Sequence, residues 1–126
     1  ISAHHCHCKD CQRTTGCGKA TILYIASKNI KVDGELKFYD SKGSSGITIR
    51  RGFCENCGSG VLSYAKELPL LKFIKAGTIE DSSWVKVDSV FFTKSANQWD
   101  MPADDIKCYE ANPNMLDNLK SVIKAL

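Results

Sequence analysis

Five of the seven cysteines stand at spacings that suit a metal ion. Three of them lie in the run Cys6-His7-Cys8-Lys9-Asp10-Cys11, called here the thiol triplet (Cys6, Cys8 and Cys11). Thiolates this close together can surround one tetrahedral ion at about 2.3 Å per sulfur, whereas disulfides among them would be strained. Cys54 and Cys57, called here the cysteine pair, have the C-x-x-C spacing of structural zinc sites. The sequence therefore predicts Zn²⁺ bound by these five cysteines.

Two ligand arrangements are compatible with these spacings. In the first, Cys6, Cys8, Cys54 and Cys57 enclose one structural ion, and Cys11 is left over. In the second, the thiol triplet holds one ion and the cysteine pair belongs to another. An ion with three protein ligands keeps an open coordination position, which is typical of catalytic zinc. The spacing alone leaves both arrangements open.

The sequence also allows predictions for the other cysteines and for the polar residues near the triplet. Cys17 and Cys108 have no partner at ligand spacing, so we expect them to be buried structural cysteines. His7 is a candidate for hydrogen bonding or proton transfer beside the metal. We expect His4 to belong to a frayed terminus and Asp10 to cap a short helix.

Composition and charge narrow the class of protein. The length of 126 residues suits a single domain over 1–126, and 43% hydrophobic with 25% charged residues is typical of globular proteins. The net charge of +3 is mild and the basic residues are scattered, so no nucleic-acid partner is expected. Neither a membrane-spanning run nor a secretory signal is found, and the unpaired cysteines favour the cytoplasm. The chain starts at Ile1 without a methionine, so we expect it to be N-terminally incomplete.

Short apolar or alternating runs between turn residues predict a mainly β fold of small antiparallel sheets. The expected strands cover residues 21–26, 36–39, 47–53, 61–64, 71–74 and 84–93. A short helix is expected over 9–15, ending at Gly16. A C-terminal helix is expected over 112–126, with Asn112 as cap and Pro113 at its first position. Its apolar face, expected to pack on the rest of the protein, consists of Met115, Leu116, Leu119, Val122, Ile123 and Leu126.

These motifs resemble a known family. Residues 5–16, HCHCKDCQRTTG, are similar to the HCHCxDCQRxTG signature of the glutathione-dependent formaldehyde-activating enzyme family, which includes centromere protein V. Residues 51–59, RGFCENCGS, resemble the second motif of that family, and residues 76–81, AGTIED, resemble a third. Further similarities extend to Glu110. The resemblance therefore covers most of the chain.

The resemblance implies an Mss4-like (β-tent) fold with two zinc ions. It implies that Cys6, Cys8 and Cys11 hold a catalytic ion, and that Cys54 and Cys57 share a structural ion with an upstream C-x-C motif that this chain lacks. It also implies a carbon–sulfur lyase of the S-hydroxymethylglutathione synthase type. In such an enzyme a small thiol such as glutathione occupies the open zinc position and adds to a small aldehyde such as formaldehyde. Three thiolates suit this soft ligand better than they suit water activation.

The sequence also suggests residues that could contact the substrate, and it leaves an alternative function open. Lys9, Arg13, Arg50 and Arg51 are candidates for contacting the carboxylates of the thiol. Arg13 is preferred because it follows the triplet by two residues, and His7 is the second substrate-binding candidate. The alternative is a non-catalytic zinc-binding interaction module of the same fold. Two departures from the family favour it, namely the missing upstream C-x-C and the segment 90–92, Val-Phe-Phe, where the family often has a histidine.

Overall fold

The computed structural model describes residues 1–43 and 45–126. Its strands are β1 (Ser2–Cys6), β2 (Ala20–Ala26), β3 (Lys37–Lys42), β4 (Thr48–Phe53), β5 (Gly60–Ala65), β6 (Leu71–Lys75), β7 (Ser89–Phe91) and β8 (Lys107–Cys108). The α-helices are α1 (Lys9–Thr15) and α2 (Met115–Ala125), and the short 3₁₀ helices are η1 (Ser27–Asn29), η2 (Ala76–Thr78), η3 (Thr93–Ser95) and η4 (Gln98–Asp100). The expected mainly β, Mss4-like architecture with a C-terminal helix is confirmed.

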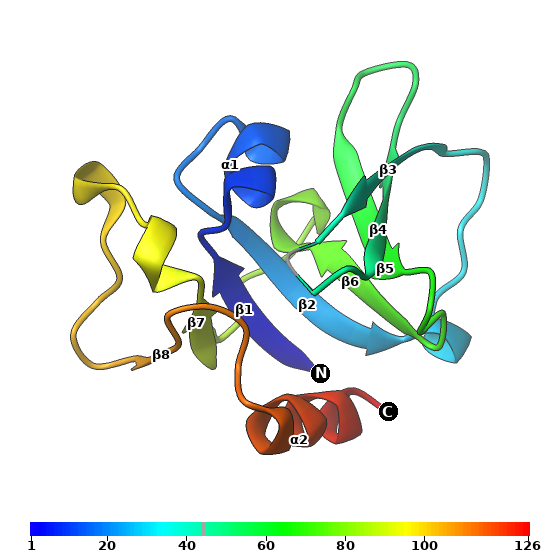
Figure 1. Ribbon diagram of the computed structural model, residues 1–126. Coiled ribbons are helices and arrows are strands. Elements are labelled where there is room, and N and C mark those ends of the chain that lie inside the picture. Colours follow the sequence, from blue (N-terminus) through cyan, green and yellow to red (C-terminus); the bar gives the residue numbers. More distant parts are fainter. Residues whose placement is uncertain (44) are drawn as a thin grey trace.

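The eight strands of the described residues belong to one sheet with the order β3-β4-β5-β6-β2-β1-β7-β8. The neighbours from β3 to β1 run antiparallel, whereas β1–β7 and β7–β8 are parallel pairs. The sheet is strongly curved, so that β3, β4 and β5 turn away from β1 and β2, while α1 stands at the end of β1 (Figure 1). The β1–α1 junction, which carries the thiol triplet, is therefore attached to a central strand of the sheet.

The main hydrophobic core lies where β1, β2 and β7 meet. Tyr24 of β2 packs against Phe73 of β6 with ring centroids 4.9 Å apart, and Phe91 of β7 stacks on the His4 ring at 4.7 Å. Cys6 and Cys11 belong to the same cluster of buried residues. Two of the three triplet sulfurs are consequently held by the core itself.

The first helix begins and ends close to the expected positions. Cys8 is its N-cap, with an extended backbone, and its sulfur accepts the Cys11 N–H at 3.3 Å. The expected cap, Asp10, lies inside the first turn instead, so that prediction is wrong. Gly16 ends the helix with a left-handed φ of 66°, a conformation that costs glycine little, as predicted.

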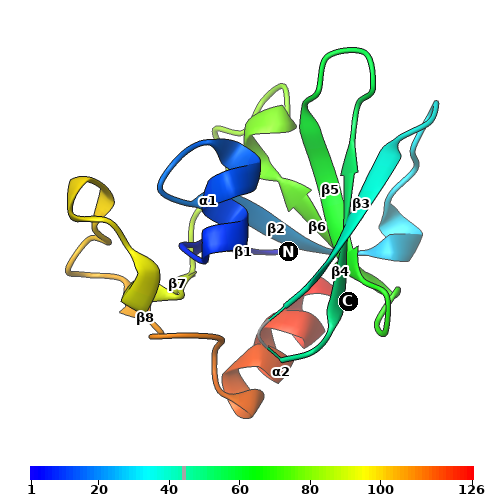
Figure 2. The same ribbon diagram turned by 45° about the horizontal axis from the view of Figure 1, so that its top comes forward.

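The C-terminal helix is capped by Asn114, whose side chain accepts the Asp117 N–H at 2.9 Å, and not by Asn112. It packs on the protein through Ala125 and Val122. Figure 2 shows it lying against one end of the sheet. Most of its apolar face is exposed, as for Met115, Leu116, Leu119, Ile123 and Leu126. The expectation that this whole face packs inward is therefore wrong, because the sheet offers it only a narrow contact.

The strand expected over residues 84–93 is much shorter in the structure. Only Ser89–Phe91 pair with β1, and the segment before them is irregular. The irregular segment ends at Asp88, whose carboxylate accepts the Ala3 N–H of β1 at 2.9 Å. Phe92 stops the strand on the other side with a left-handed φ of 59°. No helix within residues 1–43 and 45–126 has the length and apolar character to cross a membrane.

Candidate metal centre

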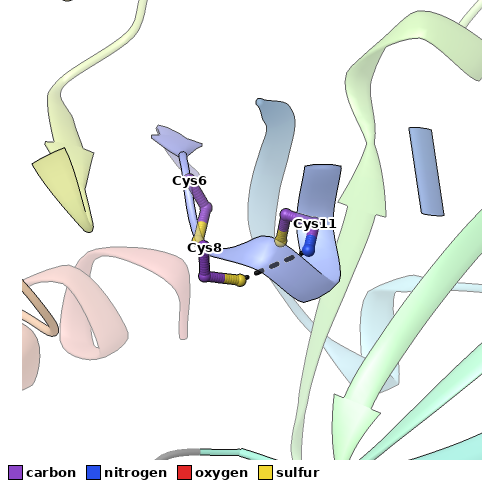
Figure 3. Close-up of side chains that lie close together, drawn as sticks. All are labelled: Cys6, Cys8 and Cys11. Atoms are coloured by element: carbon purple, nitrogen blue, oxygen red, sulfur yellow. Dashed lines mark hydrogen bonds between the residues drawn. The ribbon is translucent and has the colours of Figure 1, made fainter. Parts of the chain in front are cut away.

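The three thiols of the triplet converge at the junction of β1 and α1 (Figure 3). Their sulfur atoms all lie within 4.8 Å of one another. Cys6 and Cys11 are each 7% exposed, and Cys8 is half-buried. The cluster is therefore a largely covered set of sulfurs whose most accessible member is Cys8.

Main-chain hydrogen bonds position each of these residues. Cys6 ends β1, where it is paired with Ala20 of β2 and Phe91 of β7. The His7 N–H then donates to the Phe91 carbonyl at 3.0 Å and holds the chain beside β7. One helical turn separates Cys8 from Cys11 and returns the third sulfur to the first two. The sequence C-x-C-x-x-C thus combines a strand end with a helix start.

The three thiols are electrostatically unequal. The pKa of Cys8 is lowered well below that of a free thiol, because Cys11 and Cys6 donate hydrogen bonds to its sulfur and Arg51 adds a positive charge nearby. The pKa of Cys6 is raised, because its proton is held in hydrogen bonds to Cys11 and Cys8 and because it is buried. A metal ion replaces these shared protons when it binds.

The donor set fits a soft or borderline divalent ion. Sulfurs around tetrahedral zinc lie about 3.8 Å apart when each Zn–S bond is about 2.3 Å. The observed cluster, with all separations within 4.8 Å, needs only a small contraction to reach that arrangement. Within residues 1–43 and 45–126, no other group of three or more Cys, His, Asp or Glu residues brings its ligand atoms within 4.8 Å of one another. The triplet can therefore hold a metal ion, and no described side chain joins it as a fourth ligand at that distance.

The cysteine pair occupies a different environment. It follows β4 in a tight turn, in which the Cys54 N–H donates to Ser59 O at 2.9 Å and the Gly58 N–H donates to Cys54 O at 2.7 Å. Gly58 supports this turn with a φ of 76°. Cys54 is half-buried and Cys57 is exposed. The structure does not bring the pair into the triplet, and this favours the second of the two ligand arrangements.

The two expected substrate-binding residues differ in their exposure to solvent. His7 is only 1% exposed, and its Nδ1 has no hydrogen-bond partner within the described residues. Burial lowers its pKa below the usual value for histidine. Arg13 is exposed on α1. A helix advances about 100° per residue, so a side chain two positions after Cys11 points to the opposite side of the helix.

A residue that sequence reasoning gave no role proves central to the junction. The Gln12 side-chain amide donates to the His7 carbonyl at 2.8 Å and to the Ser95 carbonyl at 2.9 Å. Its oxygen accepts from Asn97 Nδ2 at 3.0 Å. Gln12 therefore connects the loop between Cys6 and Cys8 to the segment after β7. Its position directly after Cys11 and its place in the quoted signature HCHCxDCQRxTG were the available signals.

Three further expectations are wrong. Cys17 is exposed in the turn after α1, and Cys108 is exposed on the two-residue edge strand β8. His4 is only 1% exposed and not frayed, because β1 lies between β2 and β7. Its ring nitrogens lie 2.7 Å from Ser89 Oγ and 2.9 Å from Ser2 Oγ. None of the three contributes a ligand to the thiol cluster.

The fold and the thiol cluster define a small, mainly β protein with a three-cysteine cluster that could hold a metal ion. The family described as glutathione-dependent formaldehyde-activating enzyme matches residues 1–95, and the chain belongs to this family. A search of curated proteins finds no match. The resemblance carried by the cysteine motifs is thus confirmed, and the family associates the chain with glutathione-dependent formaldehyde activation.

Proposed function

We propose that this protein joins a small thiol such as glutathione to a small aldehyde such as formaldehyde, and cleaves the same carbon–sulfur bond in reverse. The observation that carries the proposal is the three-sulfur cluster without a fourth described ligand, in a chain of this family. Cys6, Cys8 and Cys11 would hold one Zn²⁺. An ion held there would supply an open coordination position that favours the thiolate form of an incoming thiol.

The reaction needs little more than this activation and correct placement. The substrate thiolate attacks the carbonyl carbon, the carbon–sulfur bond forms, and the carbonyl oxygen takes up a proton to give a hydroxymethyl thioether. Lyase action is the reverse of these steps. Placing both reactants together removes part of the entropic barrier. The half-buried Cys8 marks the side of the cluster that a thiol reaches from solvent.

The remaining site residues are assigned roles that suit their positions. We keep His7 and Arg13 as proposed substrate contacts, although contact with His7 requires displacement of the chain that covers it. Cys54 and Cys57 would hold a second ion only together with ligands from outside the described residues. Seven free thiols require a reducing environment, so we place the protein in the cytoplasm.

The proposal is tested by the exchange rate between free and thiol-bound formaldehyde. Carbon-13 exchange spectroscopy with labelled formaldehyde and glutathione measures this rate above the spontaneous background. Zinc-loaded wild-type protein should accelerate the exchange. The Cys11→Ser variant should lose that acceleration and keep its far-ultraviolet circular dichroism. The Cys17→Ser variant, changed at an exposed thiol outside both motifs, should behave as wild type.

A contrary result selects the alternative function. If zinc-loaded wild-type protein leaves the exchange rate at the spontaneous value, the protein is a non-catalytic zinc-binding module of this fold. If Cys11→Ser retains full acceleration, the triplet is not the site of reaction.

A further inference from the structure

Two cationic side chains share the face of the sheet that carries the thiol triplet. Arg51 of β4 is paired with Ser63 of β5, Ser63 with Phe73 of β6, and Phe73 with Tyr24 of β2. Directly paired residues of antiparallel strands project to the same face. Tyr24 belongs to the core cluster that contains two of the triplet cysteines. The row therefore places Arg51 on the triplet's face of the sheet.

Strand alternation and a second strand pairing place Lys75 on the same face of the sheet. It follows Phe73 by two residues on β6, and strand side chains alternate with a period of two. Its partner on β2 is Ile22, which belongs to the core cluster with Cys6 and Cys11. The half-buried Lys75 has its pKa lowered by burial, and the Cys11 sulfur nearby opposes that effect. Lys75 thus lies within electrostatic reach of the triplet.

Neither cation is paired with a carboxylate in the part of the chain that the structure describes. In residues 1–43 and 45–126, no carboxylate lies within ion-pair distance of Lys75 or Arg51. Arg51 Nη1 donates to Ser41 Oγ, but its buried Nε has no acceptor among the described residues. The neighbouring Arg50 projects to the opposite face, where it is 3.7 Å from Asp40. Partly buried, unpaired cations are costly unless an anion joins them.

We propose that Arg51 and Lys75 form an anion-binding subsite beside the thiol triplet, and that this subsite takes a carboxylate of the substrate thiol. The sulfur would go to the triplet and a carboxylate to the two cations. The Arg51 guanidinium offers a planar fork for a carboxylate, and Lys75 adds a compact charge. This inference rests on the proposed function and deepens it, because it adds a carboxylate contact on the sheet to the proposed contact with Arg13.

The subsite is tested by a binding measurement that does not depend on turnover. S-methylglutathione keeps the carboxylates and lacks a free thiol, and its dimethyl ester lacks both carboxylates. Each is titrated into zinc-loaded protein and followed by chemical-shift changes in NMR spectra. Removing one charge-assisted hydrogen bond should weaken binding about 10–100-fold. We therefore expect this loss for S-methylglutathione in Arg51→Gln and in Lys75→Met, with no change for the ester.

The strand alternation supplies a matched control. Arg50→Gln alters the adjacent arginine on the other face and should leave binding of S-methylglutathione unchanged. Zinc content is measured for every variant, because the alternative role of the two cations is to offset the negative charge of three thiolates on one ion. Loss of zinc in Arg51→Gln and Lys75→Met without selective loss of the carboxylate ligand would overturn the inference.

Two other outcomes also contradict it. One is failure of wild-type protein to prefer S-methylglutathione over its ester. The other is an affinity loss confined to Arg13→Gln, which would place carboxylate recognition on α1 alone. If instead the selective loss appears but formaldehyde exchange is not accelerated, the subsite stands and the proposed reaction fails.

Discussion

The thiol triplet and the cysteine pair have similar sequence signals and different structural settings. The triplet ends a central strand, its sulfurs all lie within 4.8 Å of one another, and Cys6 and Cys11 belong to the hydrophobic core. The pair follows β4 in a turn where Cys57 is exposed, and it belongs to no group of three ligands within the described residues.

The difference shows that ligand spacing predicts local proximity and not a complete site. The C-x-x-C turn is closed by its own backbone hydrogen bonds, and it places the Cys54 thiol within hydrogen-bonding reach of Cys57. A complete set of ligands depends on which segments the fold places beside that turn. The triplet avoids this dependence, because its three sulfurs come from six consecutive residues.

The largest expected effect separates the two motifs by metal affinity. In competition with a chromophoric chelator, Cys11→Ser should lose the tightly bound zinc that wild-type protein retains, because two sulfurs are left to hold the ion. Cys57→Ser should retain it. Loss of that zinc in Cys57→Ser, with retention in Cys11→Ser, would instead support the four-cysteine arrangement.

The second-largest expected effect concerns Gln12, which holds the loop between Cys6 and Cys8 in place. Gln12→Ala removes the hydrogen bonds to the His7 and Ser95 carbonyls. Groups that orient metal ligands typically contribute about 10–100-fold in affinity, so zinc affinity should fall by that factor. Asn97→Ala, which leaves both donor bonds of Gln12 in place, is the control and should have a smaller effect. Equal affinities in wild type and Gln12→Ala would show that the loop needs no such support.

Packing around the two motifs can be compared with a pair of glycine substitutions. A Cβ on the buried Gly18 would lie 2.8 Å from Asp100 Cβ, near the Asp100–Lys19 ion pair. Gly18→Ala should therefore lower the free energy of unfolding by about 1–3 kcal/mol. A Cβ on Gly60, close to the cysteine pair, meets nothing within 4 Å, and Gly60→Ala should not destabilise the protein. Chemical denaturation measures both, and equal losses would contradict the contrast.

The smallest expected effect is a difference between Cys57 and the triplet cysteines in the pH at which their thiols react. The Ser59 hydroxyl, 3.2 Å from the Cys57 sulfur, is the main cause of the lowered pKa of Cys57. A lowered pKa means that the reactive thiolate is present at lower pH than in a free cysteine. In zinc-loaded protein near neutral pH, iodoacetamide should therefore alkylate Cys57 before Cys6 or Cys11, as read by peptide mass spectrometry. Ser59→Ala should shift the Cys57 reaction to higher pH, and an unchanged profile would remove Ser59 as the cause.

The features that were predictable from sequence are those set by nearby residues. The triplet, the helix that ends at Gly16, and strands β2, β4 and β6 follow from spacing, left-handed glycine and apolar alternation. Family membership also depended on contiguous motifs and is confirmed.

The features that escaped prediction depend on distant segments. His4 is buried because β7 pairs beside β1, and its contact with Ser89 joins residues 85 positions apart. Lys75 and Arg51 share the triplet's face only through the order of β4, β5, β6 and β2 in the sheet. The exposed apolar face of α2 has the same origin, since helical periodicity does not reveal how much surface the sheet provides.

The most direct test of the central claim is the number of sulfur ligands around the bound ion, measured by X-ray absorption at the zinc edge in the Cys54→Ser/Cys57→Ser variant. We predict three sulfurs at about 2.3 Å, becoming four when glutathione is added. Four sulfurs before any thiol is added, or a count that glutathione leaves at three, would contradict an ion held by Cys6, Cys8 and Cys11 with one position open to substrate.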